Sequence, residues 1–305
     1  MFKYFLIFLF AAILFTGCTS ETNSEASNAI EQNADLNLPG AVATPTPSPL
    51  ELADDEDIDF EYSDYLDGLE FFEMLRENPA IMLQLTPVNP GEELLILHTN
   101  LGDITLRFFP EEAPLAVENF ITHARNGFYD GVIFHRVIPG FMIQGGDPEG
   151  TGMGGESIWG EPFFVEPSIN LRHFRGALAM AHAGGRMGSQ FYIVQNTLLS
   201  TQFLMDFDEM YFFHDLAIGE FSDGYRITWG HLHPQDGLRY FIENGGTPQL
   251  DWFWNDFPGG PHTVFGHVVE GMDVVDAIAN TPRGATDRPD EDVIIERVSF
   301  FIYGG

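Results

Sequence analysis

The residues most able to do chemistry stand together between positions 134 and 155, in the stretch FHRVIPGFMIQGGDPEGTGMGG. Arg136 precedes an apolar pair, Phe141 and Met142, and Gln144 follows two residues after that pair. A guanidinium stays protonated and presents its donors in a rigid fork, so it can be aimed at one acceptor. A strand arginine is usually only a surface charge, but these dense apolar and amide neighbours favour a functional site.

This stretch resembles the cyclophilin-type peptidyl-prolyl cis/trans isomerases, and the resemblance covers about residues 94–303 apart from two insertions. It implies a mainly β fold: a closed eight-stranded antiparallel barrel capped by two α-helices, here with an inserted helical or loop segment. It also implies an enzyme that needs no nucleophile, metal or cofactor, because rotation about an amide breaks no covalent bond.

The chemistry that the resemblance implies is rotation of an X–Pro bond against a barrier of about 18–20 kcal/mol, which exists because resonance holds the amide planar. The catalyst must favour the twisted amide. A hydrogen-bond donor aimed at the imide nitrogen would stabilise the lone pair that localises there, while a dry apolar pocket holds the proline ring. Arg136 is the candidate donor.

The resemblance also assigns the other site residues. The catalytic positions are Arg136, Phe141, Gln144 and His262, and the substrate-binding positions are Met142, Gly152, Ala181, His182, Ala183, Gln190, Tyr192 and Leu250. The aromatic and methionine side chains are expected to form pocket walls, and the two glutamines to bond the substrate backbone or hold the arginine. The histidine at 262 is a wall and a possible donor. The backbone of residues 181–183 is expected to pair with the peptide before the proline.

Three positions depart from the family pattern. Tyr192 stands where a second phenylalanine is common, and its hydroxyl would need a partner or water if it lined the pocket. His182 stands where asparagine is common, which a backbone contact tolerates. Gln249 occupies the position of a pocket tryptophan, so this wall is missing unless Trp252 or Trp254 reaches the pocket.

The first 17 residues carry one lysine and then an apolar run too short for an ordinary membrane span. Cys18, the only cysteine, follows directly. This arrangement resembles a bacterial lipoprotein signal, which implies lipidation of Cys18 and anchoring to the extracytoplasmic face of the cell membrane. A plain signal peptide, or an uncleaved anchor with an incidental cysteine, is the alternative.

Residues 18–57 are expected to be a disordered tether, because their composition buries too little apolar surface to become ordered. Residues 58–91 are expected to hold a short acidic helix and a linker, with apolar residues at near-helical spacing up to Leu75 and a stop at Pro79. The isomerase domain is expected at residues 92–305.

Hydrophobic patterning and turn residues predict eight strands and two principal helices. The strands are expected at residues 94–98, 103–108, 133–138, 141–145, 177–181, 190–195, 262–269 and 293–303. The helices are expected at residues 111–126 and 272–280, with a shorter one at residues 237–244.

Two insertions are expected, at about residues 198–248 and 252–261. The first is rich in aromatic residues and could be a lid beside the groove or a packed surface subdomain. His231 and His233 lie within it, and other histidines occur at 173, 182 and 214. Without acids or cysteines at ligand spacing, solvated loop histidines are favoured over a metal site, and no metal is expected.

The formal net charge of −33, from 13 basic and 46 acidic residues, leaves no basic face for phosphates, so nucleic acid is not an expected partner. The expected partners are proline-containing peptides, folding secreted proteins and the membrane through an N-terminal lipid, and the chain is expected to be a monomer. The expected function is prolyl isomerisation in exported proteins outside the cytoplasmic membrane. Two alternatives remain: a proline-peptide binding module with weak catalysis, and a surface interaction protein that uses the aromatic insertion.

Overall fold

The computed structural model describes residue 73 and residues 75–199, 215, 217–221, 223–251 and 261–304. The predicted leader, Cys18, the tether, most of the acidic helix and most of the second insertion lie outside the described residues. Residues 75–77 are helical and Pro79 is not, as predicted. No helix in the described ranges has the length and apolar character needed to cross a membrane.

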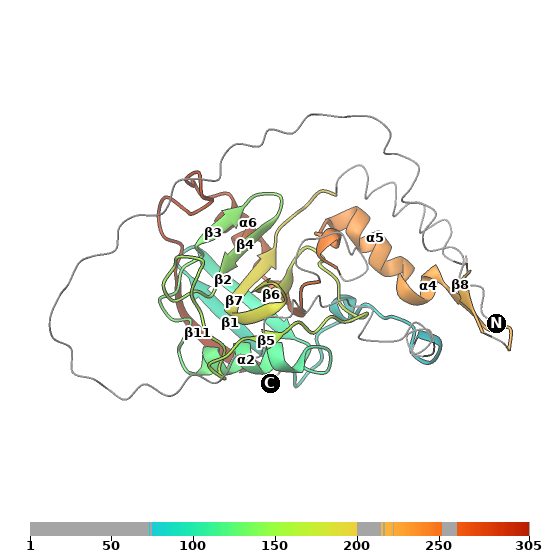
Figure 1. Cartoon of the computed structure of the whole chain (residues 1–305). Helices are drawn as coiled ribbons and strands as arrows, with labels where there is room; N and C mark the ends of the chain where they lie inside the picture. The colour runs from blue at the N-terminus through green and yellow to red at the C-terminus, as the bar shows by residue number, and fades with distance from the viewer. Residues whose placement is uncertain are drawn as a thin grey trace, which may run out of the picture. The chain divides into compact units, whose positions relative to one another are not determined.

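One curled antiparallel sheet forms the body of the protein (Figure 1). Its strands are β1 (Glu93–Thr99), β2 (Gly102–Phe108), β3 (Arg136–Ile138), β4 (Met142–Gly145), β5 (Phe163–Phe164), β6 (Ala177–Ala183), β7 (Arg186–Val194), β10 (Val264–Glu270) and β11 (Ile295–Ile302). Their order is β11-β1-β2-β10-β6-β7-β4-β3, and β5 pairs with β7. Each of the eight predicted strands is present, so the mainly β class is confirmed.

The strand bounds differ from the prediction where pairing extends or interrupts a strand. β7 begins at Arg186, four residues before the predicted start, because its first residues pair with β6 and with the unpredicted β5. β3 begins at Arg136, later than predicted, because Ile133 makes only an isolated bridge to Ile294. Apolar runs indicate that a strand exists, but the partner decides where it ends.

The helix α2 (Pro114–Arg125) begins three residues later than predicted. Proline is tolerated in the first helical turn because the N–H that it lacks would have no partner within the helix. The free N–H groups of Leu115 and Ala116 instead donate to the Glu166 carboxylate, at 3.1 and 2.8 Å. Gly127 follows the helix with φ at 71°, the left-handed conformation common just beyond a helix C-terminus.

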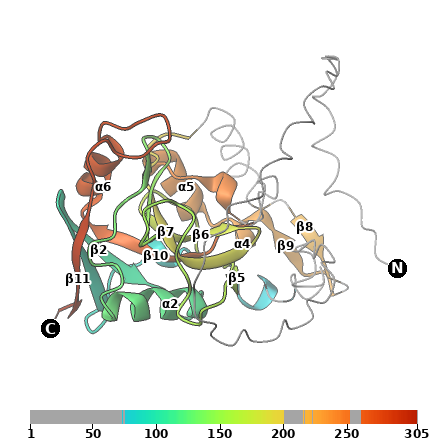
Figure 2. The same cartoon turned by 60° about the vertical axis from the view of Figure 1, so that its left-hand side comes forward.

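The helices α2 and α6 (Met272–Ala279) bury their apolar faces in the same core as the sheet, and Figure 2 shows them at different ends of it. The centre of this core is aromatic: Phe120 of α2 meets Phe191 of β7 edge-on, with ring centroids 5.2 Å apart, and tilts against Phe265 of β10. Aromatic pairs in such geometry stabilise a core beyond their buried area. Packing in this core therefore fixes the positions of β4, β6 and β7, the strands whose residues form the site.

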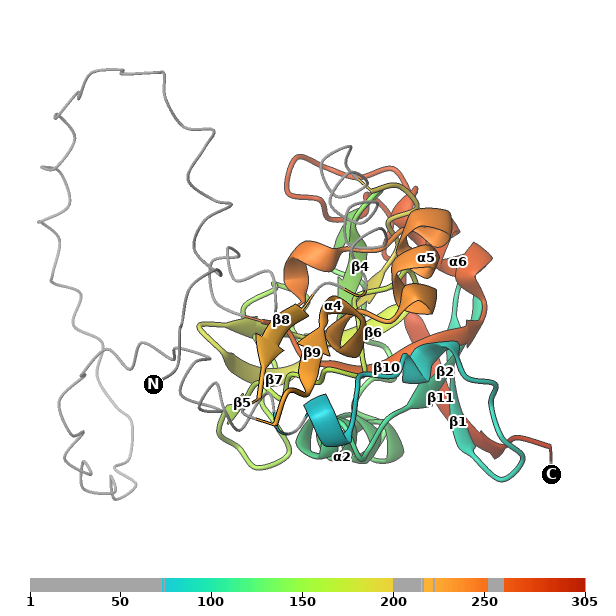
Figure 3. The same ribbon diagram turned by 90° about the vertical axis from the view of Figure 1, so that its right-hand side faces the viewer.

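The first insertion forms a packed subdomain in its described part. It contains β8 (Ala217–Glu220), β9 (Arg226–Thr228), α4 (Trp229–Leu232), α5 (Gln235–Asn244) and the 3-10 helix η3 (Pro248–Leu250), gathered beside the sheet in Figure 3. Leu238 and Phe241 of α5 pack with Phe174 and with Met82, which precedes the first strand. A bridge between Phe174 and Gly246 joins the subdomain to the segment before β6. This packing favours the subdomain interpretation over a lid.

The prediction of solvated loop histidines is wrong at His173 and His233. His173 and His233 have 1% and 4% of their surface exposed, respectively. His231 bonds the hydroxyls of Tyr225 and Thr228. His214 lies outside the described residues. His173 and His233 are buried by contacts between segments distant in sequence, which loop composition does not reveal, whereas His231 is half-buried and bonds near neighbours.

Candidate active site

A pocket of about 350 Å³ lies where β3, β4, β6 and β7 meet. It is lined by Arg136, Phe141, Met142, Gln144, Ala181, His182, Ala183, Gly184, Tyr192, Leu250 and His262. All predicted site residues are in this lining except Gly152 and Gln190, and Gly184 lines the pocket without having been predicted. The sequence motif and three distant segments therefore meet at one cavity.

Arg136 is held at the pocket by a chain of amide side chains. It lies opposite Gln144 in the β3–β4 register, and its Nη1 is 3.5 Å from Gln144 Oε1. Gln144 Nε2 donates to Gln190 Oε1 at 2.9 Å, and Gln190 Nε2 donates to the Gly152 and Gly154 carbonyls at 3.1 and 2.7 Å. Each amide therefore fixes the next, and Gly152 and Gln190 support the pocket from behind its lining.

The glycine loop that anchors this chain is organised by Asp147. Its carboxylate accepts the N–H groups of Glu149, Thr151, Gly152 and Gly154, and it has no exposed surface. Burial opposes ionisation, but these backbone donors outweigh it and lower the pKa of the Asp147 carboxyl. Gly152 adopts φ of 81°, a conformation that strongly favours glycine, so the loop delivers its carbonyl to Gln190.

The apolar side of the pocket comes from the β3–β4 turn and from the end of the insertion. Gly140 has φ of 75°, and Phe141 N–H donates to Ile138 O at 3.0 Å, which closes the turn and brings Phe141 to the cavity. Met142 and Leu250 have 2% of their surface exposed. Trp252 and Trp254 lie outside the described residues, and Gln249 is not in the lining. The described wall is thus phenylalanine, methionine, leucine and tyrosine.

The end of β6 forms the opposite rim. The register with β7 shifts between Met180 and His182, so Ala181 lies at a bulge. Bulges release backbone groups from the ladder and redirect side chains next to binding sites. His182 accepts the Gly185 N–H at Nδ1 and donates from Nε2 to Pro261 O, both at 3.1 Å. The histidine that replaces asparagine therefore ties the β6–β7 turn to the end of the second insertion.

The two histidines of the lining are neutral. Their ring centroids lie 4.0 Å apart, with the ring planes tilted by 32°. Burial lowers the pKa of His182, with the Pro261 carbonyl opposing and His173 adding to the effect. Burial, then the nearby His182 and His173, lowers the pKa of His262 to about 3. Among the described lining residues, Arg136 is therefore the only charged side chain.

His262 acts as a wall in this arrangement. Its Nδ1 donates to Met180 O at 3.4 Å, and its ring lies edge-on to Tyr192, with centroids 5.6 Å apart. In the part of the chain that the structure describes, no three His, Cys, Asp or Glu side chains gather as a metal ion would require. The pocket thus offers one fixed cation, amide groups and apolar surface.

Sequence reasoning missed two residues behind the pocket, His173 and Asp251. His173 contacts the Tyr192 hydroxyl, and Asp251 contacts His173. Two signals were available: a tyrosine in place of phenylalanine needs a partner for its hydroxyl, and Asp251 directly follows the predicted Leu250.

Comparison with known proteins shows the family of the chain. The family model for cyclophilin type peptidyl-prolyl cis-trans isomerase matches residues 94–300. Proteins named "Putative peptidyl-prolyl cis-trans isomerase" from Staphylococcus saprophyticus and Staphylococcus aureus are each 44% identical, over 214 and 212 residues. These matches cover 70% and 69% of this chain and 94% and 93% of the relatives. A cyclophilin type isomerase from Cryptosporidium parvum of known crystal structure is 27% identical, with a TM-score of 0.48, covering 69% of this chain and 97% of that chain.

The fold and the pocket thus define a mainly β protein with a guanidinium beside an apolar cavity. The chain belongs to the family of cyclophilin-type peptidyl-prolyl cis-trans isomerases, and it is an enzyme of that class.

Proposed function

We propose that Arg136 supplies the hydrogen bond that favours the twisted X–Pro amide, while the apolar side of the pocket holds the proline ring. The observation that carries this proposal is that Arg136 is the only charged side chain in the described lining and is oriented by Gln144. Twisting the amide localises the lone pair on the imide nitrogen, which then becomes a good acceptor. A donor that meets this acceptor only in the twisted state raises kcat without tightening substrate binding.

Substitution of Arg136 tests this role. Arg136→Ala removes the donor, and by analogy with loss of an oxyanion-hole donor we expect kcat to fall about 10²–10³-fold with a smaller change in KM. Arg136→Lys keeps the charge but loses the planar fork, so its kcat should fall between the two. NMR exchange on a proline peptide at saturating enzyme measures the rate.

Arg186→Ala is the matched control, because Arg186 also begins a strand, is exposed, and does not line the pocket. Thermal melts report whether each variant is folded. A folded Arg136→Ala enzyme with the wild-type rate would overturn the assigned role and would leave a binding function for the arginine.

We also propose that the enzyme acts on exported proteins as they fold, from the extracytoplasmic face of the cell membrane, to which a lipid on Cys18 anchors it. The support is the position of the only cysteine directly after a short apolar run. Stable attachment needs more than one acyl chain, which a lipoprotein carries. Cys18→Ser should release the protein or leave it unprocessed. If labelled fatty acid is never incorporated into the wild-type chain, the anchor is wrong.

We further infer that the sheet closes into a barrel capped by α2 and α6, and that the domain is a monomer. Closure is supported by hydrogen bonds between the segments that lead into β3 and β11, the two ends of the strand order. Phe134 N–H donates to Val293 O and Ile295 N–H to Val132 O, both at 2.9 Å. In a closed barrel these amides exchange with deuterium as slowly as those of central strands. Rapid exchange would indicate an open edge, and sedimentation measures the oligomeric state.

A further inference from the structure

Tyr192 carries a hydroxyl on the side of the pocket that it shares with phenylalanine, methionine and leucine. Its side chain lines the pocket, yet the residue has only 4% of its surface exposed. Its hydroxyl lies 3.0 Å from His173 Nε2, on the interior side of the wall, and the two rings stack with centroids 6.1 Å apart. Burial, then the Asp251 charge, raises the pKa of Tyr192 well above its ordinary value, so the hydroxyl keeps its proton.

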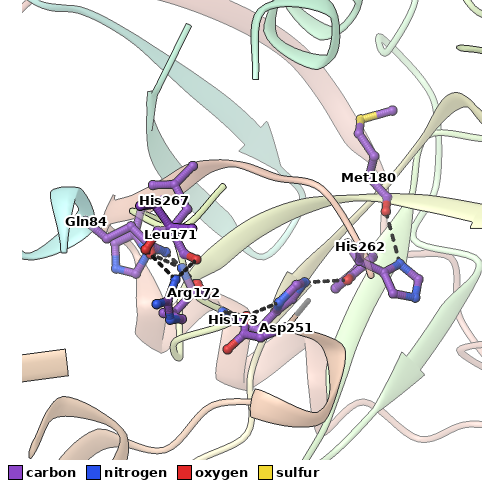
Figure 4. A network of polar contacts seen from close by, with 10 residues as sticks. Gln84, Leu171, Arg172, His173, Met180, Asp251, His262 and His267 are labelled. Atoms are coloured by element: carbon purple, nitrogen blue, oxygen red, sulfur yellow. Dashed lines mark hydrogen bonds and ion pairs between the residues drawn. The ribbon is translucent and has the colours of Figure 1, made fainter. Parts of the chain in front are cut away.

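The direction of the hydrogen bonds follows from Asp251. Its Oδ1 lies 2.7 Å from His173 Nδ1 and accepts the His173 backbone N–H at 2.8 Å (Figure 4). An acidic side chain accepts hydrogen bonds through its carboxylate oxygens, so the geometry assigns the proton between the two groups to His173 Nδ1. With the ring proton on Nδ1, Nε2 accepts and the Tyr192 hydroxyl donates to it. Second partners of this kind fix a histidine's tautomer and orientation.

We propose that Asp251 and His173 are positioning residues of the proline pocket: they retain the Tyr192 hydroxyl inside the protein so that only the ring faces the substrate. The inference rests on the proposed role of this pocket as the proline site. A tyrosine released from His173 would turn its hydroxyl toward the cavity, where a proline ring offers it no partner. Proline binding would then weaken because the hydroxyl would be desolvated without compensation.

The arrangement also connects the inserted subdomain to the pocket. Asp251 directly follows η3, and Leu250 of η3 is itself a wall residue. Thr247 N–H donates to His173 O at 2.8 Å, so the returning chain is fastened to His173 by its backbone as well. The buried Arg172 interacts with Asp251 through charge, which offsets the cost of burying the carboxylate. The chain that returns from the insertion thus supplies one wall residue, Leu250, and also Asp251, which through His173 holds a second wall residue, Tyr192.

The test is a double-mutant cycle between His173→Phe and Tyr192→Phe, with kcat and KM measured for a proline peptide on the full chain. His173→Phe keeps an aromatic ring but removes the acceptor, and residues in one hydrogen-bond network couple strongly, so KM should rise about tenfold. The change in kcat should be smaller, about threefold or less, because Arg136 is untouched. The KM of Tyr192→Phe alone is the reference for the double variant. Adding His173→Phe to Tyr192→Phe should raise KM by less than about twofold.

His123→Phe is the control for loss of a buried histidine, because His123 lies on α2, has 8% of its surface exposed and bonds the Glu156 carbonyl. It should change thermal stability without changing KM. If His173→Phe raises KM equally in both backgrounds, His173 acts only as packing and the proposal is overturned.

A measurement on the wild-type enzyme keeps the proposal testable if His173→Phe does not fold. Side-chain ¹⁵N shifts of His173 should show the proton on Nδ1, and the Nε2 shift should change in Tyr192→Phe. A proton on Nε2 would overturn the proposal. These outcomes are separate from the kcat of Arg136→Ala, which alone decides the proposed catalytic role.

Discussion

Two arginines show how differently two regions of this protein use the same side chain. Arg136, at the pocket, is exposed and lies 3.5 Å from one side-chain oxygen, that of Gln144. Arg172, where the inserted subdomain meets the sheet, has 2% of its surface exposed. Its guanidinium donates to the carbonyl groups of Ile169, Leu171 and Leu232, at 2.7–2.9 Å.

The difference shows how each region uses the N–H groups of its arginine. The donor role that we propose for Arg136 requires a guanidinium that is oriented but still has N–H groups to offer. Arg172 uses its N–H groups to satisfy carbonyls from both sides of a junction. Burial lowers the pKa of Arg172 to about 10, while Asp251 opposes the shift, so it stays charged at neutral pH. The pocket arginine keeps N–H groups available, whereas the junction arginine uses its N–H groups to stabilise the fold.

The largest expected effect is on stability, at the junction. Arg172→Met removes the donors from buried carbonyls and the positive charge near Asp251, and breaking a buried charged network costs about 3–5 kcal/mol of unfolding free energy. Urea denaturation measures it. Arg283→Met is the control, because Arg283 pairs with Asp287 near the surface and should lose less than about 1 kcal/mol. A larger loss of stability in Arg136→Ala than in Arg172→Met would break the comparison.

Two neutral histidines, one from each region, give the next test of the comparison. Burial, then the charge of Arg107, lowers the pKa of His267 to about 4, below an unfolded value of about 6.5, as burial does for His262 at the pocket. Each neutral ring therefore stabilises the fold above about pH 6.5, by an amount that is lost as pH falls toward the folded pKa, at up to about 1.4 kcal/mol per pH unit.

His267→Gln should remove the share of this pH dependence that belongs to the junction, where His267 Nδ1 accepts from Gln84 Nε2 at 3.3 Å. Urea denaturation between about pH 7 and pH 5 measures the slope for both proteins. Identical slopes for the variant and the wild type would show that His267 is not held neutral by the fold.

A smaller effect is expected for the side chain that orients Arg136. Gln144→Ala leaves the donor in place but removes the acceptor that aims it, so kcat should fall about tenfold, or about 1.4 kcal/mol. In an Arg136→Ala background the same change should matter less than about twofold, because the two residues act as one unit. NMR exchange at saturating enzyme measures both. Independent, multiplicative losses would mean that Gln144 contributes directly to the substrate instead.

The smallest effect is local. Arg76 pairs with Asp223 at 2.7 Å and lies over the Tyr225 ring, which fastens the segment before the first strand to the β8–β9 hairpin. Exposed pairs contribute little to global stability. Arg76→Ala should speed amide exchange in β8 and β9 while leaving the melting temperature and the isomerase rate unchanged. A drop in melting temperature comparable with that of Arg172→Met would show that the outer contact matters as much as the buried one.

The stretch that lines the pocket was predictable because its parts are close in sequence. Residues 134–155 carry the arginine, its orienting glutamine and the apolar pair, and a short hairpin brings such neighbours together in one fixed register. The β6 segment and Tyr192 were assigned only because their motifs resemble those of the family. The predicted strands were present, with errors at their ends, because strand ends depend on pairing.

The junction could not be predicted in the same way. His173 and Asp251 are 78 positions apart, and each alone has the composition of an ordinary loop. The contact between them depends on how the first insertion packs on Phe174 and Met82. Long-range pairing of this kind leaves no periodic signal in either segment.

The sequence by itself therefore determined the family, the class of reaction and the local pattern at the pocket, because each depends on residues at short, regular spacing. Only the tertiary structure decided which histidines are buried, how the insertion is fastened and which residues stand behind the wall. The physical reason is that burial, and with it the pKa of His262 and the hydrogen bond of Tyr192, is set by neighbours that the folded chain brings together from distant positions.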